Sequence, residues 1–112
     1  EILFDHQQLI DVPAVVAGIT ERWSNRTLTN VNDSVVRLAV IEGEFHWHKH
    51  DREDEFFFVL SGELLMDLPD RTVTLGPQQG ITISKGVQHR PRAPQRTVIL
   101  LVESSSIQPT GD

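Results

Sequence analysis

Cysteine is absent from the 112-residue chain, which excludes disulfides, thiolate chemistry, and zinc or iron–sulfur sites built on cysteine. This absence fits a cytoplasmic protein. No apolar run approaches the roughly 18 to 20 residues of a membrane-spanning helix, so we expect no membrane partner. A positive surplus is also missing, because the formal net charge is −6 and the ten Lys and Arg residues are scattered. Nucleic-acid affinity rests on clustered Lys and Arg, so we expect no nucleic-acid partner.

The chain is long enough for one domain and too short for two. From Ser34 onward short apolar runs alternate with turn signals, a pattern typical of an all-β sandwich or barrel. The runs are Val35 to Ile41, Phe56 to Leu60, Leu64 to Leu68, Val73 to Leu75, Ile81 to Ile83 and Val98 to Val102, and the last turn between them covers Pro91 to Pro94. We therefore expect a β domain over residues 34–103 and a Ser-rich tail over 104–112.

Residues 1–33 are expected to form an N-terminal arm that packs on the β domain. Asp5, followed three residues later by Gln8, favours a short helical turn, which Pro13 would end. The apolar residues from Val15 to Ile19 then predict a strand.

Four of the five histidines fall where they can serve one metal site, and only His6 lies outside it. Three of the four alternate along one segment. In an extended segment alternate side chains share a face, so His46, His48 and His50 point the same way. Neighbours two residues apart are separated by roughly 7 Å, close enough for two imidazoles to reach one ion, whereas three in a row span roughly 13 Å. One outer histidine must therefore miss the ion.

Glu55 breaks this alternation and would face away from His50 in a continuous strand. The polar residues 51–54 suit a turn or bulge, which would reset the alternation and bring Glu55 inward. This favours His48, His50 and Glu55 as ligands and leaves His46 outside. His89 follows a second strand end and has no local explanation, so it is a candidate for the same site.

Three imidazoles and one carboxylate suit a divalent transition metal such as Fe, Mn, Ni, Co, Cu or Zn, and disfavour Ca and Mg. Two stretches of the chain resemble the paired motifs of the cupin superfamily: His48 to Gly62, with its HxH, four residues, Glu, six residues, Gly spacing, and Lys85 to Pro91. Three shorter stretches resemble small single-domain cupins of the mannose-6-phosphate isomerase-like group: Gly43 to His50, Asp54 to Phe57 and Thr110 to Asp112. The resemblance implies a cupin-type jelly-roll β-barrel that holds its metal with His48, His50, Glu55 and His89.

Other residues are candidates for contact with a small polar or anionic ligand. His46 is the candidate catalytic base, because its near-neutral pKa would suit proton transfer; a polar neighbour of the pocket is the alternative. Arg90 and Arg92 can clamp a carboxylate or phosphate at the barrel mouth, unless they are only solvated. Phe57 is expected to line the pocket beside Glu55.

Phe56 and Phe58 face the other side of the same strand and need a cover, which predicts a homodimer. The site itself supports two functions that the sequence leaves open. One is a metalloenzyme of the isomerase, lyase or dioxygenase type, with the metal as Lewis acid or oxygen-activating centre. The other is a non-catalytic cupin that binds or senses a small molecule.

Overall fold

The computed structural model describes residues 1–112 and contains one short helix and seven strands. The elements are α1 (Val12–Ala17), β1 (Trp23–Val31), β2 (Ser34–Glu44), β3 (Glu55–Ser61), β4 (Leu64–Asp67), β5 (Thr72–Leu75), β6 (Gly80–Ile83) and β7 (Arg90–Ser104). Every strand pair is antiparallel. The prediction of an all-β jelly-roll is thereby confirmed. The hydrogen-bonded sheet, in the order β1-β2-β7-β3-β6 with β4 and β5 as a branch on β7, is not closed into a barrel.

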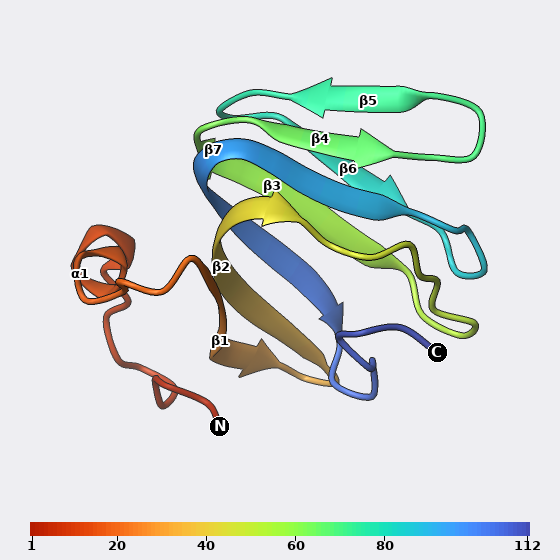
Figure 1. Ribbon diagram of the computed structural model, residues 1–112. Coiled ribbons are helices and arrows are strands. Elements are labelled where there is room, and N and C mark those ends of the chain that lie inside the picture. Colours follow the sequence, from red (N-terminus) through yellow and green to blue (C-terminus); the bar gives the residue numbers. More distant parts are fainter.

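Two long strands, β2 and β7, pair with each other at the centre of the sheet (Figure 1). The pairing of β2 with β7 shifts register between Ile41 and Gly43, where β2 bends. The first residues of β7, Arg90 to Arg92, pair with β4, and its second half pairs with β3. The turn expected at Pro91 to Pro94 is therefore wrong: these residues belong to β7, where Pro91 and Arg92 pair with neighbouring strands.

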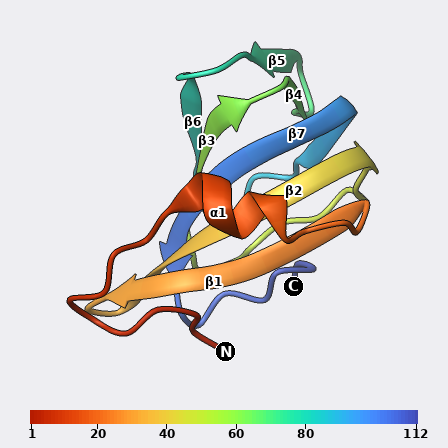
Figure 2. The same ribbon diagram turned by 90° about the vertical axis from the view of Figure 1, so that its left-hand side faces the viewer.

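Side chains alternate between two hydrophobic cores. Along β2 the residues Leu38 to Ile41 are all buried. Ala39 and Ile41 belong to the main core, whereas Leu38 and Val40 belong to a smaller one. The smaller core is covered by apolar side chains of α1, which lies across the outer face of β1 and β2 (Figure 2). Burial on both faces explains why β2 reads as an uninterrupted apolar run.

The N-terminal arm differs from its prediction. The helix is α1, where a strand was expected, and Pro13 stands in its first turn instead of ending it. Pro is tolerated there because the first helical N–H groups have no intrahelical partner. Asp11 caps the helix by accepting a hydrogen bond from the backbone N–H of Ala14 at 3.3 Å. Asp5 and Gln8 form only a single turn, with the Asp5 N–H donating to Gln8 Oε1 at 2.7 Å.

The sheet also begins earlier than residue 34. Strand β1 pairs with β2 along its length, from Trp23 opposite Ile41 to Val31 opposite Ser34. This strand is rich in Ser, Asn and Thr and carries only three apolar side chains, so it lacks the apolar run that marks the other strands. The helix is six residues long, and no helix is long and apolar enough to cross a membrane.

Candidate metal centre

Two chain segments far apart in sequence meet at a small antiparallel bridge. The backbone N–H of His48 donates to the carbonyl of His89 at 3.0 Å, and the N–H of His89 donates to the carbonyl of His48 at 2.8 Å. The N–H of Gly86 extends this contact by donating to the carbonyl of His50 at 2.7 Å. These bonds place three histidines on facing backbones at one end of the sheet.

Glu55 reaches the same place from the start of β3. The chain bends at Asp51 and Arg52, and the Asp54 carboxylate accepts a hydrogen bond from the backbone N–H of Lys85 at 2.9 Å. Glu55 then pairs with Ile83 on one side and Glu103 on the other, with its side chain buried. The predicted reversal over residues 51–54 is confirmed.

The four predicted ligands lie together. Their ligand atoms are all within 4.8 Å of one another, and none of the four residues is more than 7% exposed: His48, His50, Glu55 and His89. The Nε2 atoms of His50 and His89 each lie 3.3 Å from the same Glu55 oxygen, Oε1. Three ring nitrogens and a carboxylate therefore converge on one point.

Hydrogen bonds around the rings test whether this cluster fits a metal. The Nδ1 atom of His48 lies 3.0 Å from the His46 carbonyl, and that of His89 lies 2.9 Å from the Val87 carbonyl. A carbonyl only accepts, so each Nδ1 carries the proton and each Nε2 presents a lone pair. Both ring nitrogens of His50 are buried without a hydrogen bond of good geometry. Buried polar atoms are rarely left without a partner, and a metal ion bound to His50 would give one of these two nitrogens its partner.

The electrostatics place His48 and Glu55 in the states that metal ligands need, whereas the Glu55 carboxylate outweighs burial and raises the pKa of His50. Burial, aided by the nearby His89 and His50, lowers the pKa of His48 and favours its neutral form. Burial alone would raise the pKa of Glu55, but the adjacent imidazoles of His50 and His89, whose Nε2 atoms lie 3.3 Å from its Oε1, outweigh burial and lower that pKa to about 2. A neutral imidazole beside an ionised carboxylate is the pairing that a divalent cation requires.

His46 stays outside the cluster, as the alternation argument predicts. Its exposed ring stacks on Phe45, with centroids 4.2 Å apart, and its Nε2 donates to the Thr110 carbonyl at 2.6 Å. Because the carbonyl accepts, Nδ1 is the basic nitrogen of this ring. A catalytic role for His46 stays a prediction.

Residues after β7 do not extend away as a tail. The stretch 107–112, which we call the closing segment, folds back over the cluster, beginning with the buried Ile107. The Asp112 carboxylate accepts from the Asp51 N–H at 2.6 Å, and the Asp112 N–H donates to the Lys49 carbonyl at 2.9 Å. Gly111, with φ +99°, lies so close to His48 that a Cβ added to it would stand 2.6 Å from the His48 Cβ.

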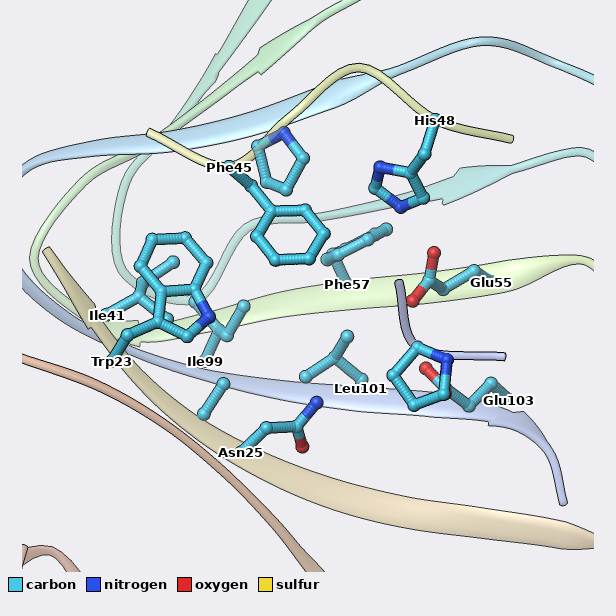
Figure 3. A pocket seen from close by; sticks show the side chains of 13 residues that line it. Trp23, Asn25, Ile41, Phe45, His48, Glu55, Phe57, Ile99, Leu101 and Glu103 are labelled. Atoms are coloured by element: carbon cyan, nitrogen blue, oxygen red, sulfur yellow. The ribbon is translucent and has the colours of Figure 1, made fainter. Parts of the chain in front are cut away.

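A cavity of about 50 Å³ lies beside the cluster (Figure 3). Figure 3 shows His48, Glu55 and Glu103 at one end of the cavity and Trp23 with Phe45 at the other. The lining residues are Trp23, Asn25, Ala39, Ile41, Phe45, His48, Glu55, Phe57, Pro91, Ile99, Leu101, Glu103 and Pro109. Phe57 lines the cavity as predicted. Trp23 and Phe45 stack with centroids 5.4 Å apart, and Pro109 of the closing segment forms part of the wall.

Glu103 is a polar residue of this cavity that the motif spacing does not indicate. It is buried, its Oε1 has no hydrogen-bond partner, and its Oε2 lies 3.6 Å from Arg37 Nε. Burial and the adjacent Glu55 carboxylate raise the pKa of Glu103 to about 8. The sequence signal that could have identified Glu103 is its alternation with Ile99 and Leu101, which places an acid on the inward face of the last strand.

Arg90 and Arg92 are not brought to the cavity. Pro91, between them, lines it, so alternation turns both arginines to the opposite face. There Arg92 donates to Asp67 at 2.7 and 3.1 Å, and Arg90 donates to the same carboxylate at 2.9 Å. Hydrogen bonds from Arg92, with help from Thr72 and Arg90, hold the pKa of Asp67 well below its usual range. The arginines clamp a carboxylate, but one that belongs to the protein itself.

Comparison with known proteins agrees with the fold and the site. The model of the cupin domain family matches residues 28–103, and the chain therefore belongs to the cupin family. The uncharacterized protein YdbB of Bacillus subtilis (strain 168) is 45% identical over 91 residues, which make up 80% of this chain and 80% of YdbB. These likenesses confirm the cupin resemblance found in the two histidine motifs.

Two crystal structures show the same architecture. A cupin-2 domain containing protein from Shewanella frigidimarina is 33% identical, with a TM-score of 0.83 over 86% of this chain and 94% of that chain. A protein from Neisseria meningitidis is 26% identical, with a TM-score of 0.78 over 88% of this chain and 100% of that chain.

Proposed function

We propose that this protein is a metal-binding cupin that acts on a small molecule at a divalent transition metal held by His48, His50, Glu55 and His89. The observation that carries the proposal is the convergence of these four ligand atoms within 4.8 Å in a buried site. Two of the imidazoles already have their Nδ1 protons fixed by backbone carbonyls. The metal, which would be Fe, Mn, Ni, Co, Cu or Zn, supplies a Lewis acid or a redox centre when bound.

The remaining residues of the site would bind and enclose the substrate. Trp23, Phe45 and Phe57 make most of the cavity wall apolar, which excludes bulk water and strengthens polar contacts inside. Glu103 offers a carboxyl group at the end of the cavity nearest Glu55 (Figure 3). His46 remains the proposed base, and its Nδ1 is the atom that would take the proton. Isomerase, lyase and dioxygenase chemistries are all compatible with this arrangement.

The second candidate is a cupin that binds or senses a small molecule without turnover. The small size of the cavity and the hydrogen bonds that hold the closing segment beside it favour this candidate, because a rapid catalyst needs an open route for substrate and product. The same four ligands serve both candidates. We likewise propose, from its sequence motifs, that the protein belongs to the mannose-6-phosphate isomerase-like group.

Metal analysis tests the part that both candidates share. Protein purified by conventional chromatography should contain close to one transition-metal ion per chain. The double variant His48→Ala/His89→Ala should lose it, while His46→Ala should retain it. Unchanged metal content in the double variant would refute the assignment of the site. With metal loaded, turnover of a compound supports the enzyme, and thermal stabilisation without turnover supports the binding protein.

We also propose a homodimer. Phe56 and Phe58 lie on the sheet face opposite to Glu55 and Phe57, with ring centroids 6.2 Å apart. Both are only partly buried in the single chain, and Val102 is 39% exposed. Val102 pairs with Phe56 across the sheet, so the three side chains form one apolar surface.

A further inference from the structure

We propose that Asp112 is a positioning residue of the metal site: its carboxylate accepts the Nδ1 proton of His50 and so aims Nε2 of that ring at the ion. This inference deepens the proposed function and rests on it, because it concerns a ligand of the same metal. Three observations carry it: an imidazole without a hydrogen bond, the two anchors of Asp112, and the nearness of its carboxylate to the ring.

His50 is the ligand histidine whose ring no hydrogen bond holds. In His48 and His89 the Nδ1 proton is held by the carbonyl two residues earlier, at 3.0 and 2.9 Å. For His50 that carbonyl belongs to His48, and it accepts the backbone N–H of His89 at 2.8 Å. Both nitrogens of the His50 ring lack a hydrogen bond, and the side chain is only 2% exposed. Metal-bound histidines almost always donate the second ring N–H to a carboxylate, a carbonyl or water, so His50 needs such a partner.

The direction of the ring decides which nitrogen needs it. Nε2 of His50 lies 3.3 Å from Glu55 Oε1, within the cluster of four ligand residues. The metal therefore takes Nε2, and Nδ1 keeps its proton. A neutral imidazole that binds an ion through one nitrogen is a hydrogen-bond donor at the other. The missing partner of His50 must thus be an acceptor near Nδ1.

Asp112 is anchored on both sides of His50. Its backbone N–H donates to the carbonyl of Lys49 at 2.9 Å, and its Oδ2 accepts the N–H of Asp51 at 2.6 Å. Lys49 and Asp51 are the two chain neighbours of His50, so these bonds fix the carboxylate beside it. The bond from Asp51 uses Oδ2 and leaves Oδ1 available as the acceptor.

The carboxylate also lies near the ring. A ring nitrogen of His50 and carboxylate oxygens of Glu53 and Asp112 are all within 4.8 Å of one another. A hydrogen bond of about 2.9 Å requires a further approach, which a small rotation of the imidazole supplies. Glu53 is the other acid within reach, but its hydrogen bond runs to the Ser106 hydroxyl at 3.0 Å. Its longer side chain is not tied to the residues that flank His50, so Asp112 is the better acceptor.

Zinc titrations of four proteins test the inference: wild type, Asp112→Asn, Asp112→Ala and Glu53→Gln. Competition with a chromophoric chelator gives Kd and the number of ions per chain. Asp112→Ala should weaken binding about 10- to 100-fold, the range found when the outer partner of a metal-bound histidine is removed. Asp112→Asn keeps an oxygen acceptor and the contact with the Asp51 N–H, so it should retain part of the affinity. Glu53→Gln is the matched control and should bind Zn²⁺ as wild type does.

The ring protons separate positioning from a general loosening of the site. Long-range proton–nitrogen NMR of the Zn²⁺-loaded protein reports the Nδ1–H of each ligand histidine. In Asp112→Ala the His50 signal should be lost to exchange with water, and in Asp112→Asn it should persist at a changed shift. The signals of His48 and His89 should stay, because backbone carbonyls hold their protons. Equal changes at all three histidines would show that Asp112 only holds the closing segment in place, which would overturn the proposal.

Failure of this inference and failure of the proposed function give different results. An unchanged Kd in both Asp112 variants, or a loss of affinity in Glu53→Gln instead, would overturn the inference and leave the metal site standing. A second Zn²⁺ per chain that these variants lose would also overturn it, since His50, Glu53 and Asp112 would then hold an ion of their own. A wild-type chain that binds no Zn²⁺ would refute the proposed function, and this inference with it.

Discussion

His48 and His89 are joined backbone to backbone by two reciprocal hydrogen bonds of 3.0 and 2.8 Å, and their rings lie with centroids 4.3 Å apart. The two residues are 41 positions apart in the sequence. Because the main chain, and not the side chains, makes this link, the imidazoles are held together whether or not an ion lies between them. The cluster is thus preorganised, which lowers the entropic cost of binding a metal.

His89→Ala should therefore keep the fold and lose the metal. The variant retains the backbone bridge to His48, so only the ligand is removed. In wild-type protein, Zn²⁺ at about 100 times its Kd should stabilise the fold by about 2.7 kcal/mol. Thermal unfolding with increasing Zn²⁺ measures this, and His89→Ala should show little of the rise. His46→Ala is the control, because His46 lies outside the cluster and should leave the rise intact.

The contact of Gly111 with His48 predicts that even a methyl group will displace the closing segment. Gly111→Ala adds a Cβ at 2.6 Å from the His48 Cβ, whereas Gly86→Ala, at a similar positive φ, meets nothing within 4 Å. Both variants carry the backbone strain of a left-handed residue, but only Gly111→Ala has the clash. Amide hydrogen exchange at Asp51 and Asp112 should accelerate in Gly111→Ala alone. Equal exchange in the two variants would show that strain, and not the contact, governs the segment.

The pair Glu55 and Glu103 predicts a pH dependence in metal-free protein. Folding raises the pKa of Glu103 from 4.5 to about 8, so its stabilising contribution is complete below pH 4.5 and is lost as the pH rises through 8. Folding lowers the pKa of Glu55 to about 2, so its contribution is present above pH 4.5 and is lost toward pH 2. Between pH 4.5 and 8 the Glu103 effect should dominate, with a slope of at most about 1.4 kcal/mol per pH unit.

Urea unfolding of metal-free protein between pH 5 and 8 measures this slope. Glu103→Gln has no carboxyl group to ionise and should flatten it. His48 and His50 contribute in opposite senses, because folding lowers the pKa of the first and raises that of the second. A decline of the same steepness in Glu103→Gln would assign the proton to another group.

Asp67→Asn should lower the stability of the protein and leave its metal site intact. The substitution removes the charge that Arg90 and Arg92 both contact, which should reduce the unfolding temperature by about 4–8 °C. Metal content should equal that of wild type. If Arg90 and Arg92 served a ligand instead, the wild-type protein would already bind phosphate through them, which phosphate titration would detect.

The apolar surface of Phe56, Phe58 and Val102 predicts a dimer at micromolar concentration. Sedimentation velocity should give twice the 12.7 kDa chain mass. Phe58→Glu places a charge on this surface and should yield monomers that still bind metal, since the cluster lies on the other face of β3. A wild-type monomer would refute the interface.

The ligand cluster was predictable because its spacing is a local property. Alternation along an extended segment pairs His48 with His50, and the polar turn that follows is the only way to bring Glu55 to the same side. The apolar runs predicted the strands equally well, because burial on one or both faces leaves a direct mark on the sequence. His89 was identified through its motif, since no local pattern links it to the first histidines.

Other features depended on contacts that no local pattern records. Strand β1 is polar and forms because β2 lies beside it. Pro13 stands equally well at the end or the start of a helix, and only the packing of α1 on the smaller core decides between them. The closing segment is held by single hydrogen bonds to residues some 60 positions earlier, such as Asp112 to Asp51.

The folding of residues 107–112 over the cluster decides how the protein should be handled in the laboratory. A purification tag fused after Asp112 would begin next to His48, and a polyhistidine tag there would offer foreign imidazoles to the metal. A tag placed before Glu1 would begin beside β1, where Ile2 pairs with Thr27, and apart from the C-terminal end (Figure 1). Metal content and ligand affinity measured with the tag at the wrong end would therefore describe the fusion junction and not the protein.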